Sequence, residues 1–190
     1  ATPFVNINFT GTTQSALYGE PPDTMGFVGN NQYVQFLNGT FAVYDKATGS
    51  SITQISDINF WQSAGVSIDE NSTAVSDPRV VYDPSTRHWF ASMVDFEQDE
   101  FTGEILPGNH ILFAVSHDSN PLNGWSGFQI TGEPSGTTIC DFPRLGVDSH
   151  GVYLITDNYA DETALLPTNM TILSIPKADL VTATPTLSNM

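Results

Sequence analysis

Three aspartates recur at the start of similar segments and could supply carboxylates to a single site. Asp23, Asp77 and Asp141 each precede a short apolar stretch, a polar turn and a second apolar stretch. Arginines follow two of them, as Arg79 and Arg144. Carboxylates that converge around a sugar are the acid and base of glycoside hydrolysis, and arginines beside them can bind ligand oxygens. The three aspartates are therefore the candidate catalytic residues, and the two arginines are candidate ligand-binding residues.

The same residues also have a purely structural interpretation. An aspartate in front of a strand commonly caps its own turn, through hydrogen bonds from nearby backbone N–H groups. It can equally pair with an arginine a few residues along the chain. The sequence leaves the catalytic and the structural interpretations open.

A second group of acidic residues could hold a cation. Calcium needs six to eight oxygen ligands, and the segment 95–104 offers five carboxylates. They are Asp95, Glu97, Asp99, Glu100 and Glu104. Their spacing is not that of an EF-hand loop, so a solvated acidic loop is the alternative to a specific site. Ca²⁺ is the cofactor that this pattern suggests.

The charge and composition limit the classes of partner. Lys and Arg number 5 against 21 Asp and Glu, which gives a formal net charge of −16. Such a polyanion repels nucleic acid and anionic membranes, so we expect neither as a partner. No apolar run is long enough to span a bilayer. The single cysteine, Cys140, cannot form an intrachain disulfide and is expected to be a buried thiol.

Several features indicate a mature secreted or cell-surface protein. The chain begins Ala1-Thr2-Pro3, as a protein does after removal of a signal peptide. Four Asn-X-Thr sequons permit glycosylation, at Asn8, Asn38, Asn71 and Asn169.

The spacing of the repeated segments predicts the fold. The three aspartates are separated by 54 and then 64 residues, and turn residues punctuate short apolar runs between them. We expect an all-β chain, a β-propeller of four-stranded antiparallel blades, whose inner strands begin after the three aspartates. Val5–Phe9 is predicted to be an edge strand, and Pro176–Leu180 a single helical turn. The expected single domain, 1–190, has about three blades, roughly 23–56, 77–130 and 141–190.

Three blades do not close a ring, so the propeller is expected to be incomplete. A missing C-terminal half, or a neighbouring chain, would complete it. Two insertions interrupt the repeats, and the first of them, 57–76, carries Trp61. We expect Trp61 to contact a ligand because long loops on a β scaffold are commonly functional.

Several segments resemble a group of secreted microbial β-propeller proteins, mostly of uncharacterised function. The resemblance rests on 21–29, 38–46, 77–84, 114–125 and 141–148. Within it, Ser116-x-Asp118 followed by Trp125 is similar to the Asp-box turn of sialidase-like propellers, which implies a structural role. A sialidase itself is a poor match, because the third arginine, Arg87, lies in an outer turn.

The function expected from the sequence is a secreted or cell-surface structural or binding module without catalysis of its own. A carbohydrate or a cell-surface polymer is its expected ligand. The alternative is an extracellular polysaccharide hydrolase that uses the carboxylates at the channel mouth as acid and base.

Overall fold

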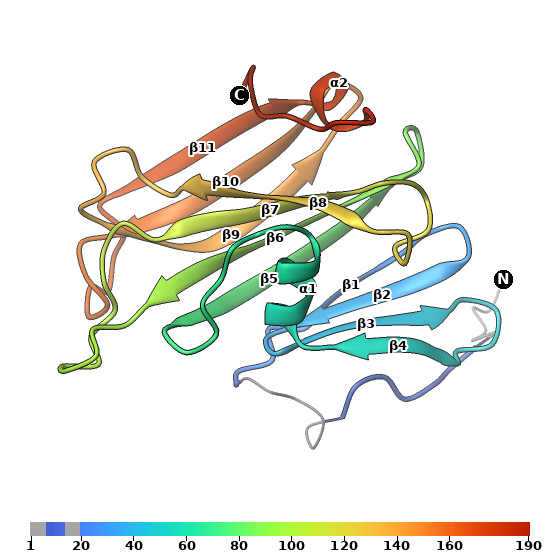
Figure 1. Ribbon diagram of the computed structural model, residues 1–190, viewed down its shortest axis with the longest axis horizontal. Helices are drawn as coiled ribbons and strands as arrows, with labels where there is room; N and C mark the ends of the chain where they lie inside the picture. Colours follow the sequence, from blue (N-terminus) through green and yellow to red (C-terminus); the bar gives the residue numbers. More distant parts are fainter. Residues whose placement is uncertain (1–6, 14–19) are drawn as a thin grey trace, which may run out of the picture.

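The computed structural model describes residues 7–13 and 20–190, and it is built almost entirely of antiparallel β-sheet (Figure 1). The first sheet is formed, in spatial order, by β1 (Met25–Val28), β2 (Gln32–Leu37), β3 (Thr40–Asp45) and β4 (Ser51–Ile55). The second sheet is formed by β5 (Thr73–Asp83), β6 (His88–Glu97), β7 (His110–Ser116) and β8 (Trp125–Thr131). The third sheet has three strands, β9 (Ile139–Val147), β10 (Gly151–Tyr159) and β11 (Asn169–Pro176). The predicted all-β class with antiparallel four-stranded sheets is confirmed.

The first strand of each sheet lies toward the middle of the molecule. Strand β5 contacts both β1 and β9, and the later strands of each sheet extend outward from them (Figure 1). Side chains at the ends of the first strands of different sheets can therefore lie close together, although they are far apart in the sequence.

The core has two layers, one on each face of the second sheet. On β6, Trp89, Ala91 and Met93 belong to the cluster shared with the first sheet. Phe90 and Val94 belong to the cluster shared with the third sheet. Because neighbouring residues of a strand point to opposite faces, a strand covered on both sides is apolar at almost every position.

One short helix was not predicted, and it changes the interpretation of Trp61. Helix α1 (Asp57–Ser63) begins after Ser56, whose hydroxyl accepts a hydrogen bond from the Asn59 N–H. The helix buries Trp61 completely, and its indole N–H donates to the Met93 sulfur at 3.2 Å. The prediction that Trp61 contacts a ligand is therefore wrong, because the ring has no exposed surface.

The N-terminal segment packs on the first sheet without forming the predicted strand. The first part of the expected strand, Val5 and Asn6, lies outside the described residues, and 7–9 form no strand. The Phe9 ring instead lies 6.2 Å from that of Tyr33 and 5.2 Å from that of Tyr44, between ring centroids. This contact covers part of the face of the first sheet that points away from the second.

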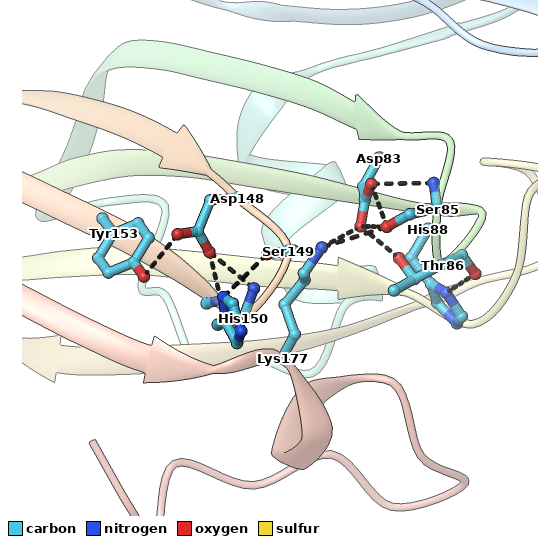
Figure 2. Close-up of polar contacts among 10 residues, drawn as sticks. Asp83, Ser85, Thr86, His88, Asp148, Ser149, His150, Tyr153 and Lys177 are labelled. Carbon is cyan, nitrogen blue, oxygen red and sulfur yellow. Dashed lines mark hydrogen bonds and ion pairs between the residues drawn. The ribbon is translucent and has the colours of Figure 1, made fainter.

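A buried ion pair joins the second and third sheets at one end. Helix α2 (Lys177–Leu180), the predicted helical turn, follows β11 directly. Lys177 is 4% exposed, and its ammonium donates to the Asp83 carboxylate at the end of β5 (Figure 2). Burial would raise the pKa of Asp83, but hydrogen bonds from Lys177, Ser85 and Thr86 outweigh it and hold that pKa well below its usual range.

Removing the Lys177 charge should destabilise the protein strongly. Lys177→Met leaves the buried Asp83 carboxylate without a cation, which is expected to lower the free energy of unfolding by about 3–5 kcal/mol. Urea unfolding at pH 7 measures this. In the wild type, the contribution of Asp83 should be present at neutral pH and lost as the pH falls below about 4, because the folded-state pKa is the lower one.

The matched control is the double variant Asp83→Asn/Lys177→Met, in which no charge is left buried. It should be more stable than the sum of the two single changes predicts. Strict additivity of the two would show that the pair contributes nothing as a pair.

Candidate functional site

The first strand of each sheet has the same irregularity at the end opposite to the Lys177–Asp83 pair. In β5 the register slips between Ser76 and Arg79, so that one extra residue opposes its partner strand. In β9 the same slip falls between Asp141 and Arg144. In the first sheet, the regular β1–β2 pairing reaches Met25, which lies opposite Phe36. The Asn38 N–H then donates to the Pro22 carbonyl at 3.0 Å, so three residues before Met25 correspond to two residues after Phe36, which is an equivalent slip. Each first strand therefore carries a β-bulge, a feature that redirects side chains.

The bulges show which residues of the three repeats correspond. Each contains one non-glycine residue with positive φ: Asp23 at 38°, Asp77 at 60° and Phe142 at 55°. Phe142, not Asp141, is thus the counterpart of Asp23 and Asp77, and Asp141 lies one position earlier. The bulges also correct the predicted boundaries, because β5 and β9 begin before Asp77 and Asp141 rather than after them.

Asn38 links two of the three predicted aspartates. Its amide nitrogen donates to Asp23 Oδ2 at 2.8 Å, and its amide oxygen accepts from the Asp77 N–H at 2.9 Å. Because Asn38 belongs to the first sheet and Asp77 to the second, this side chain fixes the two sheets relative to each other.

The burial of Asn38 also bears on the predicted glycosylation sites. Asn38 is only 6% exposed and its amide nitrogen already donates a hydrogen bond, so the prediction that Asn38 carries a glycan is wrong for the folded chain. Asn8, Asn71 and Asn169 are exposed, and glycosylation there stays a prediction.

Asp77 lies where a carboxyl group tends to keep its proton. Burial, a hydrogen bond with Asp23 and the negative charges of Asp141 and Asp23 raise the pKa of Asp77 to about 7. The positive charge of Arg79 opposes this shift without cancelling it. The three predicted aspartates do interact, and together with burial they raise the pKa of Asp77 to the range in which a carboxyl can donate a proton near neutral pH.

The two predicted arginines also come together, around a ring that the sequence did not single out. The guanidinium carbons of Arg79 and Arg144 lie 5.0 and 5.1 Å from the centroid of the Phe142 ring. Arg79 donates to the Pro78 carbonyl at 2.7 Å, and Arg144 lies 3.5 Å from Asp157. An aromatic ring with two guanidiniums therefore adjoins the carboxylates.

Two hollows have Asp141, or neighbours of Asp23 and Asp77 such as Asn38, in their walls. A hollow of about 500 Å³ is lined by Asn38, Asp57 and Glu70, among others. Asp57 is buried, accepts from the Gly39 N–H at 2.6 Å, and has its pKa raised by burial. A second hollow of about 360 Å³ has Asp141 in its wall.

The predicted calcium ligands are not arranged as a cation site. Asp95 is 2% exposed and accepts hydrogen bonds from the His110 N–H at 2.6 Å and the Gln129 amide at 2.7 Å. Asp99 caps its own turn through the N–H groups of Phe101 and Thr102. Within 7–13 and 20–190, no three His, Cys, Asp or Glu side chains are grouped to hold a metal ion, and this applies to Glu97, Glu100 and Glu104 too.

Comparisons with known proteins identify a fold but no family. No protein-family model and no curated protein matches the chain. Among solved structures, an exo-β-1,3-galactanase from Clostridium thermocellum is similar over 86% of this chain, at 12% identity and a TM-score of 0.53. An exo-β-1,3-galactanase from Phanerochaete chrysosporium, solved with galactose, covers 86% of the chain at 10% identity and a TM-score of 0.47. The chain spans 36% and 37% of these proteins, about a third of their length.

Loss of the Asn38 amide should loosen the junction between the first two sheets. Asn38→Ala leaves the buried Asp77 N–H without an acceptor and Asp23 without a donor, which is expected to lower the free energy of unfolding by about 1–3 kcal/mol. Asn71→Ala is the control, since this exposed asparagine should change stability by less than about 0.5 kcal/mol. Urea unfolding of both variants measures the difference, and equal stabilities would contradict the role assigned to Asn38.

Proposed function

We propose that this chain carries the acid and base of a polysaccharide hydrolase at the ends of its first strands. The observation that supports it most directly is Asp77, a buried carboxyl held beside two other carboxylates with its pKa raised to about 7. Glycoside hydrolysis needs one carboxyl that is protonated near neutral pH and another that is ionised. The likeness in fold to a galactanase is consistent with this choice but does not identify the substrate.

The geometry suggests different roles for the three aspartates. Asp77 would donate its proton to the glycosidic oxygen as the bond from that oxygen to the anomeric carbon breaks. Asp141, in the wall of a hollow, would act on the anomeric carbon, either directly or by taking a proton from an attacking water. Asp23 would keep the proton on Asp77, because it is fixed by Asn38 and its charge disfavours ionisation of its neighbour.

This proposal replaces the function preferred from the sequence. The structural or binding module was favoured because no convergent acid–base pair could be assigned along the chain. The interaction of Asp77 with Asp23 and Asp141 supplies such a pair. An extracellular setting remains part of the proposal. The turn at Asp118 would keep the structural role that its resemblance to an Asp-box implies: Asp118 accepts a hydrogen bond from the Asn120 N–H, and Trp125 is buried.

Asp77→Asn should abolish hydrolysis while leaving binding intact. Loss of a general acid lowers the turnover rate by about 10²–10⁴-fold, and asparagine tolerates the positive φ at this position. Release of reducing sugar from a panel of polysaccharides measures it. Wild-type turnover should fall as the pH rises through about 7, because only the protonated form of Asp77 donates.

Asp148→Asn is the matched control, since Asp148 caps the β9–β10 turn and is expected to leave turnover unchanged. Stability offers an independent readout. Between pH 4 and pH 7 Asp77 ionises in the unfolded chain but keeps its proton in the folded one, which favours unfolding, so the stability of Asp77→Asn relative to wild type should grow over this range. No turnover on any polysaccharide, with that stability difference present, would refute the hydrolase but not the placement of Asp77.

We further propose that the three sheets are blades of a larger propeller. The face of the third sheet turned away from the second exposes Met170 at 61% and Ile172 at 68%. Apolar strand residues this exposed are normally covered by a neighbouring sheet. This chain spans only 36% of the Clostridium galactanase, which is consistent with a larger propeller.

The mass of the native protein tests the larger propeller. We expect either a longer polypeptide or a stable assembly in which Met170 and Ile172 are covered. Replacing both by Asp should disrupt the assembly, whereas replacing the exposed Asn169 by Asp should not. A closed 20.6 kDa monomer would contradict the proposal.

A further inference from the structure

The pair of arginines at Phe142 is unusual for a chain of this charge. The sequence has five Lys and Arg residues and a net charge of −16, yet two of its three arginines lie against one aromatic ring. Each guanidinium carbon lies within cation–π distance of the Phe142 ring, at 5.0 Å for Arg79 and 5.1 Å for Arg144, so one ring holds both cations at this end of the sheets. Their position beside Asp77 and Asp141 makes them part of the same end of the molecule as the proposed catalytic carboxyls.

The backbone at Phe142 is strained in the manner of a functional position. Its φ of 55° is tolerated by Asp at the equivalent positions, but it is rare for a bulky aromatic residue. The ring is also 43% exposed, so burial of apolar surface does not explain the choice of phenylalanine. Strained residues that the fold retains are concentrated where ligands bind.

The two guanidiniums retain capacity for a ligand. The Arg144 side chain is 51% exposed, and its carboxylate contact among the described residues, to Asp157, is long at 3.5 Å. Arg79 donates a hydrogen bond to the carbonyl of the preceding residue, Pro78, rather than to a carboxylate. A guanidinium binds a carboxylate best through two parallel hydrogen bonds. The contacts of Arg79 and Arg144 are not of this kind, so both guanidiniums can still donate hydrogen bonds to an incoming anion.

We propose that Arg79 and Arg144, held together by the Phe142 ring, bind the carboxylate of a uronic acid residue in a polysaccharide. The inference rests on the proposed function only in placing a polysaccharide at this end of the sheets. Neutral sugars would gain little from two positive charges. A uronate would accept charge-assisted hydrogen bonds from the guanidiniums, which are stronger than those to a neutral residue.

Binding measured by calorimetry tests the inference without requiring turnover. The ligands are trimers of galacturonate, glucuronate and mannuronate, each compared with its carboxyl-reduced analogue of the same linkage. We expect at least one uronate trimer to bind about tenfold more tightly than its reduced analogue, the ratio expected for a single charge-assisted contact. The ratio should fall as salt rises.

Arginine variants assign the preference to this site. Arg144→Gln should remove the tenfold preference, and Arg144→Lys should keep only part of it, because lysine has the charge but not the fork. Arg87→Gln is the matched control, an exposed arginine in the turn between β5 and β6, and it should leave the preference unchanged. Melting temperatures check that each variant is folded.

The outcomes separate this inference from the hydrolase itself. Uronate binding that depends on Arg144, without turnover, would support the subsite and refute the hydrolase. Turnover of a neutral polysaccharide, with no uronate preference, would do the reverse. Equal binding of every uronate and its reduced analogue, or absence of uronate binding, would overturn the inference.

Discussion

The β-bulge at the start of each sheet's first strand is the constraint on which the rest of this molecule depends. One extra residue in β5 and in β9 turns the chain so that Asp77 and Phe142 leave the regular alternation of the strand. Without the bulges these side chains would point into the packed layers between sheets, where an unpaired carboxylate is not tolerated. The bulges allow the two core layers to stay apolar while polar groups gather at one end.

Gathering carboxylates at one end creates an electrostatic problem that the structure resolves in two ways. The pKa of Asp77 is raised to about 7, because burial and the charges of Asp23 and Asp141 make ionisation unfavourable. Arg79 and Arg144 supply positive charge nearby, arranged around Phe142. The opposite end is different in character, since the single Lys177–Asp83 pair there is fully matched and closes the contact between two sheets.

Much of the fold could be predicted from local pattern, and the parts that could not depend on contacts between distant residues. The hairpins follow from turn residues such as Asn38-Gly39, where the glycine adopts a φ of 86°. The burial of Asp95 could also have been predicted from the sequence, because Asp95 continues the alternation of Trp89, Ala91 and Met93 along β6.

The role of Asn38 could not be predicted from the sequence, since its partner Asp77 is 39 residues away. Trp61 was misassigned because the Ser56 cap and the helix it starts were not recognised.

The register of the third repeat shows why the site was predicted only in part. The segments Asp77-Pro-Arg79 and Asp141-Phe-Pro-Arg144 can be aligned on the aspartate or on the proline, and composition favours neither. Only the pairing of β9 with β10 shows that Phe142 lies within the β-bulge between Asp141 and Arg144, which makes it the counterpart of Asp77. That one-residue difference changes the third position from a carboxylate to an aromatic ring, and it moves Asp141 into the wall of a separate hollow. The three repeats are therefore alike in backbone and different in chemistry, which is what a site with distinct acid, base and ligand-binding groups requires.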